Sequence, residues 1–256
     1  MNNYAIFKDL EDASVFITGG GSGIGASLTE CFLAQGAKVD FVQRSDCDEF
    51  LDEISSKYKY NPLFIKCDIT DIDALKSAIL DASNANGGIN VLINNAANDT
   101  RHTLAAMTTE EWDQSININL RPHFFTAQAV APFMKTQGGG SIINFSSNSY
   151  MMGNSGLPAY VTSKAGITGL TRSLARELGV DGIRVNTLIP GWVLTERQLR
   201  LWANDKDLAS HMEKQCIKEH LVPNDLIDST LFLASDASRM MTGQALVIDG
   251  GVVVTG

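Results

Sequence analysis

The most constraining feature of the sequence is a glycine-rich stretch, Thr18 to Gly25, which joins an apolar run to a helical pattern. The apolar run is Val15-Phe16-Ile17, the helical pattern continues through Ala34, and a second apolar run begins at Lys38. In this strand–loop–helix–strand order, glycines let the backbone approach a pyrophosphate, and the start of the helix offers unpaired N–H groups. The stretch therefore predicts a dinucleotide-binding loop, because a flexible linker would lack the flanking strand and helix.

The same alternation of strand and helix continues along the chain. Further strands are predicted at residues 63–67, 91–93, 142–145, 183–188 and 245–248, and helices at 72–83, 109–135, from 159 onward and at 226–234. No linker, repeat or low-complexity segment interrupts the pattern. It predicts an α/β fold, a Rossmann-type doubly wound parallel sheet with helices on both faces, in a single domain over residues 1–256.

Charge and cysteine usage exclude several classes of partner. The net charge of −9 argues against nucleic acid or an anionic membrane as a partner. The four cysteines show no paired spacing, and neither a secretory core nor a membrane-spanning run is present. The four histidines show no metal-ligand spacing, so we expect no metal site. These features favour a cytoplasmic enzyme.

The end of the second strand bears on the choice of cofactor. An acidic residue commonly stands there and holds the ribose 2′-hydroxyl of NAD. Here Asp40 lies too early, inside the strand, and Gln43-Arg44 occupies the expected position. A guanidinium can pair with a 2′-phosphate that a carboxylate would repel, which favours NADP. NAD remains the alternative, with Asp46 able to serve the ribose.

A third pattern points to catalysis. Tyr160 and Lys164 lie four residues apart on a predicted helix, and Ser147 follows a predicted strand. A phenol ordinarily titrates near pH ~10, and a neighbouring ammonium lowers that value. Tyr160 is thus a candidate general base for an alcohol or general acid for a carbonyl, with Ser147 orienting the reacting oxygen.

Taken together, these motifs resemble the short-chain dehydrogenase/reductase family over essentially the whole chain. The resemblance rests on Thr18-Gly19-x-x-x-Gly23-x-Gly25, Asp68, Asn94-Asn95-Ala96-Ala97, Asn119, Ser147, Tyr160-x-x-x-Lys164 and Pro190-Gly191 with Thr195. It implies catalytic roles for Asn119, Ser147, Tyr160 and Lys164, with Asn119 binding a water that links Lys164 to solvent. It implies cofactor binding by Gly19, Ser22, Gly23, Ile24, Gly25, Arg44, Asp68, Ile69, Asn95, Ala96, Tyr160, Lys164, Pro190, Gly191, Val193 and Thr195. It also implies a homotetramer built through long-helix pairs and the C-terminal strand.

Segments rich in polar and aromatic residues suit a polyhydroxylated substrate. The candidate substrate residues are Asn98, Arg101, His102, Ser147, Asn148, Asn154 and Trp192, and the substrate loop covers roughly residues 191–222. Three strings, Asn98-Asp99-x-Arg101-His102, Val130 to Lys135 and Gln215 to Lys218, resemble the aldose 1-dehydrogenase subgroup. That resemblance implies oxidation of a sugar at C1 to its lactone. Tyr150 stands where several of those relatives have tryptophan, which leaves the particular sugar open.

Two other functions are compatible with the sequence. One is a 3-oxoacyl-carrier-protein reductase or general ketoreductase, which predicts a basic patch near the site. The other is a non-catalytic nucleotide-sensing protein, which predicts a damaged catalytic set. The acidic chain shows no sign of the patch, and the catalytic set is intact.

Overall fold

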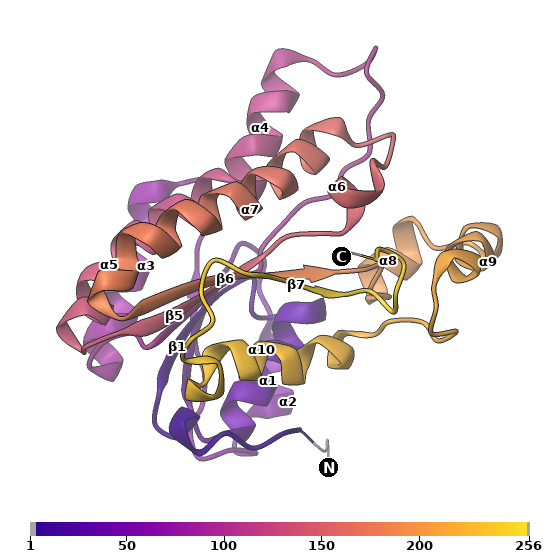
Figure 1. Ribbon diagram of the computed structural model, residues 1–256. Helices are drawn as coiled ribbons and strands as arrows, with labels where there is room; N and C mark the ends of the chain where they lie inside the picture. The colour runs from indigo at the N-terminus through magenta and orange to yellow at the C-terminus, as the bar shows by residue number, and fades with distance from the viewer. Residues whose placement is uncertain (1–3, 255–256) are drawn as a thin grey trace.

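The structure is a computed structural model that describes residues 4–254, so the outermost residues of the predicted domain, 1–3 and 255–256, lie outside it. Across the described residues, seven strands form one parallel sheet in the order β3-β2-β1-β4-β5-β6-β7 (Figure 1). The strands are β1 (Ser14–Thr18), β2 (Lys38–Gln43), β3 (Leu63–Lys66), β4 (Val91–Asn94), β5 (Gly140–Phe145), β6 (Ile183–Pro190) and β7 (Ala245–Ile248). The predicted fold class is confirmed.

Helices cover both faces of the sheet (Figure 1). One layer holds α1, α2 and α10, and the other holds α3, α4, α5 and α7. The helices are α1 (Gly23–Ala34), α2 (Asp48–Ile54), α3 (Ile72–Asn86), α4 (Thr109–Asn119), α5 (Arg121–Thr136), α6 (Ser149–Met152), α7 (Pro158–Leu178), α8 (Glu196–Leu201), α9 (Asp205–Lys214) and α10 (Ile227–Ala234). Short 3₁₀ turns cover η1 (Lys8–Leu10), η2 (Gly179–Asp181), η3 (Pro223–Leu226) and η4 (Asp236–Ser238).

The central strands are buried and mainly apolar because both of their faces are covered. Every residue of β1 is buried. Val15 and Ile17 pack in the core that includes α1 and α10, whereas Phe16 packs in the core that includes α3, α5 and α7. The alternation of side chains along the strand thus feeds two separate cores, and the sheet between them forms a rigid base for the loops at its ends.

The prediction of one helix over residues 109–135 is wrong in one respect, because two helices cover this range. Helix α4 ends at Asn119, α5 begins at Arg121, and Leu120 between them has φ −127° and ψ −50°. Pro122 explains the break, since it has no N–H to donate to the carbonyl four residues earlier and its ring would clash with that carbonyl. The break leaves Asn119 at the end of a helix, beside the loop that follows β4.

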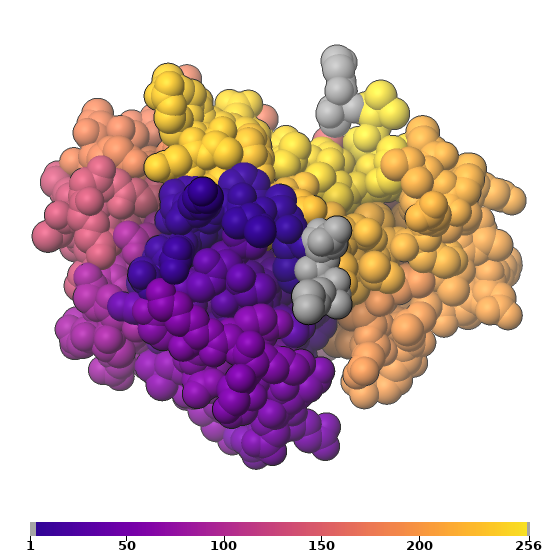
Figure 2. Space-filling model, turned by 90° about the horizontal axis from the view of Figure 1, so that it is seen from below, coloured from indigo at the N-terminus to yellow at the C-terminus, as the bar shows by residue number. Residues whose placement is uncertain are grey.

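The chain order places a ligand crevice at one end of the sheet. After β3 the chain crosses back to pair β4 with β1, so the connections run in opposite directions on either side of this pair. Ligands of open α/β sheets bind at such a switch point, outside the carboxyl ends of the strands. The segments that follow β1, β4, β5 and β6 meet there. Helices α8 and α9 stand at this end (Figure 1) and form the orange lobe beside the body of the molecule in Figure 2.

Candidate active site

The glycine loop is shaped for close approach by a ligand. Gly19 has φ +73° and Gly23 has φ +53°, conformations that residues with a side chain rarely adopt. A Cβ atom at Gly25 would lie 1.7 Å from the carbonyl oxygen of Gly19, so only glycine fits. Helix α1 begins at Gly23 with Ser22 as its N-cap, and no side chain caps its first N–H groups. This end of α1 therefore has donors available for the pyrophosphate of a dinucleotide, and the loop fits such a cofactor.

The end of β2 has a different arrangement from the one that binds NAD ribose. The Gln43 side chain accepts a hydrogen bond from the Gly21 N–H at 3.0 Å and donates one to the Ser45 carbonyl at 2.8 Å. The Asp46 carboxylate is held by the Lys66 ammonium, at 2.8 Å and 2.9 Å. Arg44 is exposed and lies close enough to Asp68 to contribute to lowering its pKa. Gln43 thus supports the glycine loop, and Arg44 is left facing solvent.

The ends of β1 and β4 are tied together. Thr18 Oγ1 accepts hydrogen bonds from the N–H groups of Asn95 and Ala96, at 3.0 Å and 3.1 Å. The Asn95 amide donates to the carbonyls of Thr18 and Gly19. These bonds fix the glycine loop against the segment after β4, so the predicted cofactor residues from both segments lie together.

Asp68 and Ile69 follow the end of β3, at the sheet edge beyond Arg44. The Asp68 carboxylate accepts hydrogen bonds from the Thr70 N–H at 2.9 Å and the Thr70 hydroxyl at 2.8 Å. The backbone bond from Thr70 is the main cause of a lowered pKa at Asp68. Ile69 is buried.

Ser147, Tyr160 and Lys164 line one cavity, although they come from two elements. Ser147 stands just after β5, and the other two are one turn apart near the start of α7. A hydrogen bond joins Ser147 to the Tyr160 hydroxyl. The Lys164 Nζ lies 5.4 Å from the centre of the Tyr160 ring and donates a hydrogen bond to the Phe145 carbonyl at 2.9 Å. The fold thus brings together Ser147, Tyr160 and Lys164, the three side chains that the sequence pattern selected.

The protonation of this group differs from the sequence-based expectation. Burial raises the pKa of Tyr160 above its ordinary value, and the hydrogen bond from Ser147 offsets this only in part. Burial also lowers the pKa of Lys164 from 10.5 to about 7. The expectation that the Lys164 ammonium lowers the phenol pKa therefore does not hold in this structure, because the amine is largely uncharged above pH ~7 and points at a carbonyl.

Asn119 supports the loop that follows β4. It is fully buried, its Oδ1 accepts a hydrogen bond from the Asn98 N–H at 2.8 Å, and its Nδ2 donates to the Asn98 carbonyl at 2.9 Å and the Ser115 carbonyl at 3.0 Å. Its side chain is therefore engaged with backbone groups, and it is not part of the cavity lining. Helix α4 ends at this residue, which explains why the side chain can reach the loop.

The cavity has a volume of about 460 Å³ and a wall of mixed character. Of the predicted substrate residues it contains Arg101, Ser147, Asn154 and Trp192. Of the predicted cofactor residues it contains Ile24, Asn95, Tyr160, Lys164, Pro190, Gly191, Val193 and Thr195. The other predicted cofactor residues are not part of the lining: Gly19, Ser22, Gly23, Gly25, Arg44, Asp68, Ile69 and Ala96. The cavity therefore joins the catalytic tyrosine and lysine to the substrate segments and reaches the start of α1 through Ile24.

Three predicted substrate residues lie outside the lining. Asn148 is buried and donates to the Asp249 carboxylate at 3.1 Å. His102 accepts a hydrogen bond from the Ala159 N–H at 3.3 Å, and Asn98 accepts one from Arg197 at 3.2 Å. Each of these three side chains thus forms a hydrogen bond within the protein. The partners are distant in the sequence, so no local pattern predicts these bonds.

The lining also contains Asp99 and Gln198, which lie within the predicted substrate segments. Among the lining residues that the sequence did not single out are Ser149, Met152 and Leu157 after β5, and one face of α9. The Asp99 carboxylate accepts hydrogen bonds from Arg197 and from Gln198, the latter at 2.7 Å. Burial acts to raise the pKa of Asp99, but these two bonds outweigh it and the pKa is lowered. Gln198 in turn accepts a bond from the Trp192 indole at 3.0 Å.

Within residues 4–254, three or more histidine, cysteine, aspartate or glutamate side chains nowhere gather as metal ligands would. Over the same residues, none of the helices combines the length and the apolar character needed to cross a membrane. All four cysteines are free thiols, and only Cys216 is exposed.

Comparisons with known proteins agree with this geometry. Residues 19–253 match the family model described as Enoyl-(Acyl carrier protein) reductase. The chain is 49% identical to a protein of Rhizobium meliloti (strain 1021) named "Probable galactose dehydrogenase GalD", over 96% of this chain and 97% of that one. It is 45% identical to a D-xylose 1-dehydrogenase of Caulobacter vibrioides, over 96% and 98%. It shares its fold with a short-chain type dehydrogenase/reductase from Mycobacterium ulcerans, with a TM-score of 0.91 and 24% identity over 97% and 91%.

Proposed function

Since this chain belongs to the short-chain dehydrogenase/reductase family and is an NAD(P)-dependent oxidoreductase, we propose that it oxidises an aldose at C1 to the corresponding lactone. The observation that carries the proposal is the pair of relatives named as galactose and D-xylose dehydrogenases, which match nearly the whole of this chain. A galactose and a xylose differ in length and in configuration. The proposed substrate class is therefore the aldoses, pentoses and hexoses alike.

The residues of the site support this reaction. A pyranose would bind with its anomeric carbon beside Tyr160 and transfer the proton of its C1 hydroxyl to the phenolate oxygen. Ser147, which lies beside the Tyr160 hydroxyl, would hold the C1 oxygen of the sugar by a hydrogen bond. A bound nicotinamide would supply the acceptor for the hydride that leaves C1. Lys164 lies where it could contact the ribose of a bound cofactor, and the proton would leave Tyr160 for solvent by way of the Lys164 amine. Asn119 would act by holding the loop that follows β4.

The polar wall of the cavity favours a substrate with many hydroxyls. Each buried hydroxyl needs a partner, because an unpaired polar group costs about 1–3 kcal/mol. Arg101 and Asn154 offer such partners, and Trp192 offers a flat apolar surface for a sugar ring. We take residues 191–222 as the substrate-binding segment of the single domain, with Asn98, His102 and Asn148 acting through the residues they hold in place.

The end of β2 supports NADP as the cofactor. Gln43 is engaged with the glycine loop and Asp46 with Lys66, so neither faces the ribose as a free acceptor. Arg44 is exposed beside them and can pair with a 2′-phosphate. Asp68 and Ile69 would then bind the adenine, as the family resemblance implies.

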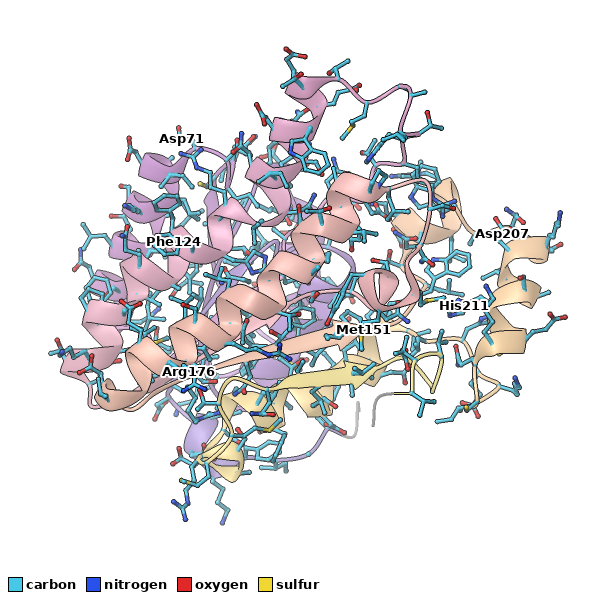
Figure 3. All side chains as sticks on the ribbon, turned by 45° about the horizontal axis from the view of Figure 1, so that its top comes forward. Asp71, Phe124, Met151, Arg176, Asp207 and His211 are labelled. Carbon is cyan, nitrogen blue, oxygen red and sulfur yellow. The ribbon has the colours of Figure 1, made fainter. Side chains whose placement is uncertain are left out.

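We further propose that the enzyme is a cytoplasmic homotetramer. Phe124 on α5 and Trp112 on α4 are 42% and 38% exposed, which suits a helix-pair interface. Figure 3 labels Phe124 on the outer side of α5, and Arg176 and Met151 near β7. Those two residues belong to a second hollow, of about 650 Å³, between α7 and β7. Light scattering would give the mass of four chains, and the mass of one chain would contradict this assembly.

A panel of aldoses tests the proposed reaction. The purified enzyme would be mixed with each pentose or hexose and with NAD or NADP, and the absorbance of the reduced cofactor would be followed. We expect at least one aldose to reduce NADP, with formation of its lactone. If no aldose reduced either cofactor while a 3-oxoacyl thioester was reduced, the substrate class would be wrong and the ketoreductase alternative would stand.

A further inference from the structure

Helix α9 turns a polar face toward the cavity. Asp207, Ser210, His211 and Lys214 all line it, at the spacing that brings side chains to one side of a helix. Figure 3 labels Asp207 and His211 on α9, at the end of the molecule where α8 and α9 stand apart from the sheet. No residue of α9 is fully buried, so this face does not pack into the protein core. Its side chains are available to a ligand in the cavity.

One nitrogen atom on this face, in the His211 ring, lacks a hydrogen-bond partner within residues 4–254. His211 Nε2 is buried and has no hydrogen-bond partner among the described residues. The imidazole is held edge-on against the Trp192 ring, with the ring centres 5.4 Å apart. A buried polar atom without a partner is unfavourable, so such atoms are rare unless a water or a ligand satisfies them. The ring thus packs against Trp192 with one nitrogen unpartnered in the part of the chain that the structure describes.

Other unpartnered atoms lie around the same cavity. Within residues 4–254, the buried side-chain nitrogen and oxygen atoms without a partner are His211 Nε2, Ser149 Oγ, Trp202 Nε1 and Ser14 Oγ. Ser149 lines the cavity with His211, whereas Trp202 lies outside the lining with its ring under the guanidinium of Arg101, 4.3 Å from the ring centre. Two of the four atoms therefore belong to residues of one site, although Ser149 and His211 are far apart in the sequence. This arrangement suits a ligand with several hydroxyl groups.

The state of the imidazole indicates which kind of group it binds. Burial and the nearby Lys214 lower the pKa of His211 below its ordinary 6.5, so the ring is neutral at neutral pH. A neutral imidazole pairs with a hydroxyl, as donor or acceptor, more readily than with an anion.

We propose that His211, through Nε2, hydrogen-bonds one hydroxyl of the bound aldose and so determines which aldoses are oxidised quickly. This inference rests on the proposed function and adds a specificity-determining residue to it. Sugars that present a hydroxyl to His211 satisfy the buried nitrogen. Sugars that lack it leave the nitrogen unpaired, and sugars that present it elsewhere leave both groups unpaired. A site that hydrogen-bonds a substrate hydroxyl discriminates strongly between sugars, because a sugar without that hydroxyl leaves a buried polar group of the protein unpaired.

The test compares two variants over a set of deoxy sugars. His211→Phe keeps an aromatic ring beside Trp192 but has no nitrogen, and His211→Gln restores an amide near the position of Nε2. Glu213→Gln, exposed on the same helix and outside the lining, is the matched control. For wild type and each variant, kcat/KM would be measured for the best aldose and for its singly deoxygenated analogues, together with cofactor affinity by fluorescence.

We expect His211→Phe to lower kcat/KM for the parent aldose by roughly 10- to 100-fold, with cofactor affinity unchanged. For one deoxy analogue the same substitution should have almost no effect, because that sugar already lacks the partner hydroxyl. His211→Gln should recover part of the loss, and Glu213→Gln should match wild type.

Two results would overturn the inference in different ways. An active wild-type enzyme in which His211→Phe reduces kcat/KM equally for the parent and every deoxy analogue, or not at all, removes the role of His211 alone. A wild-type enzyme that binds the cofactor but oxidises no aldose removes the proposed function, and the role of His211 with it.

Discussion

Lys164 Nζ donates a hydrogen bond to the Phe145 carbonyl, 2.9 Å away at the end of β5, while its distance to the centre of the Tyr160 ring is 5.4 Å. The amine is thus anchored to the sheet on one side and faces the phenol on the other. Because it is 1% exposed, its protonation is governed by burial, which lowers its pKa to about 7. The Lys164 amine therefore does not keep a permanent positive charge beside the Tyr160 phenol, because it loses its proton as the pH rises through about 7.

The first prediction concerns pH. Burial raises the pKa of Tyr160 above 10, so the phenolate that accepts a proton is a small fraction at neutral pH and grows as the pH rises. We expect kcat/KM for aldose oxidation to rise nearly tenfold per pH unit from about pH 7 to about pH 9. Reduction of the lactone, which uses the protonated phenol, should be almost independent of pH there. A plateau of the oxidation rate above pH ~7 would show instead that the phenol pKa is lowered.

The second prediction concerns the contact between α8 and the loop after β4. Arg197 donates hydrogen bonds to Asp99 and Asn98, and the Arg197 and Asp99 side chains are 42% and 21% exposed. We expect Arg197→Ala to raise KM for the aldose roughly tenfold with a smaller change in kcat, because the substrate wall loses its anchor.

The control for that substitution is Lys135→Ala, which removes the Lys135–Asp181 ion pair of 2.8 Å between α5 and η2. It should leave KM unchanged, because the pair is distant from the cavity lining. Equal KM values for Arg197→Ala and wild type would show that α8 holds its place without this contact.

The third prediction concerns stability. Asp40 is 1% exposed within β2, and burial raises its pKa from 3.8 to about 6, although Asn86 donates a hydrogen bond to it at 2.6 Å. Between these two pH values the folded chain keeps a proton that the unfolded chain has released. The free energy of unfolding therefore falls as the pH rises through this range, by about 2–3 kcal/mol in all.

Asp40→Asn removes that ionisation. We expect the variant to be more stable than wild type at pH ~7, by up to the same amount, and similar to it near pH ~4. Denaturant unfolding at both pH values measures the difference. A variant less stable than wild type at neutral pH would show that the Asp40 carboxylate is stabilised by its surroundings.

The fourth prediction concerns the cofactor. If the Arg44 guanidinium pairs with the 2′-phosphate, Arg44→Ala should weaken NADPH binding roughly tenfold and leave NADH binding unchanged. Raising the salt concentration should reduce the difference, because the residue is exposed. Lys57→Ala, which removes a cation that pairs with Glu30 and Glu53, serves as the control. Equal losses for NADPH and NADH would contradict the assignment of NADP.

The sequence predicted the parts of the fold that depend on local pattern. The apolar run at Val15, the glycines that follow and the Tyr160–Lys164 spacing each have a physical reason to appear in that order. Helices α8 and α9 were not predicted, because they are short and bury no residue fully, and they begin where Thr195 and Asn204 cap them. The spacing of Asp207, Ser210, His211 and Lys214 was a signal for a helix face, but it has meaning only once the helix is known.

The substrate wall was predicted less well than the catalytic group. Asn148 was predicted to bind substrate because it follows Ser147. In the structure its amide donates a hydrogen bond to Asp249, which lies far away in the sequence, directly after β7. The break at Leu120 could have been expected from Pro122, since a proline favours the first turn of a helix. The lowered pKa of Lys164 could not, because it depends on burial that only the packing of α7 on β5 produces.

The most direct test of the account is the rate of aldose-dependent NADP reduction by Tyr160→Phe, measured beside its NADPH affinity. The variant keeps the ring and loses only the hydroxyl that accepts the proton. We expect turnover to fall by at least about 10³-fold while NADPH binds as in wild type. Turnover within a few-fold of wild type would contradict the assignment of Tyr160 as the base, and with it the reaction proposed for this site.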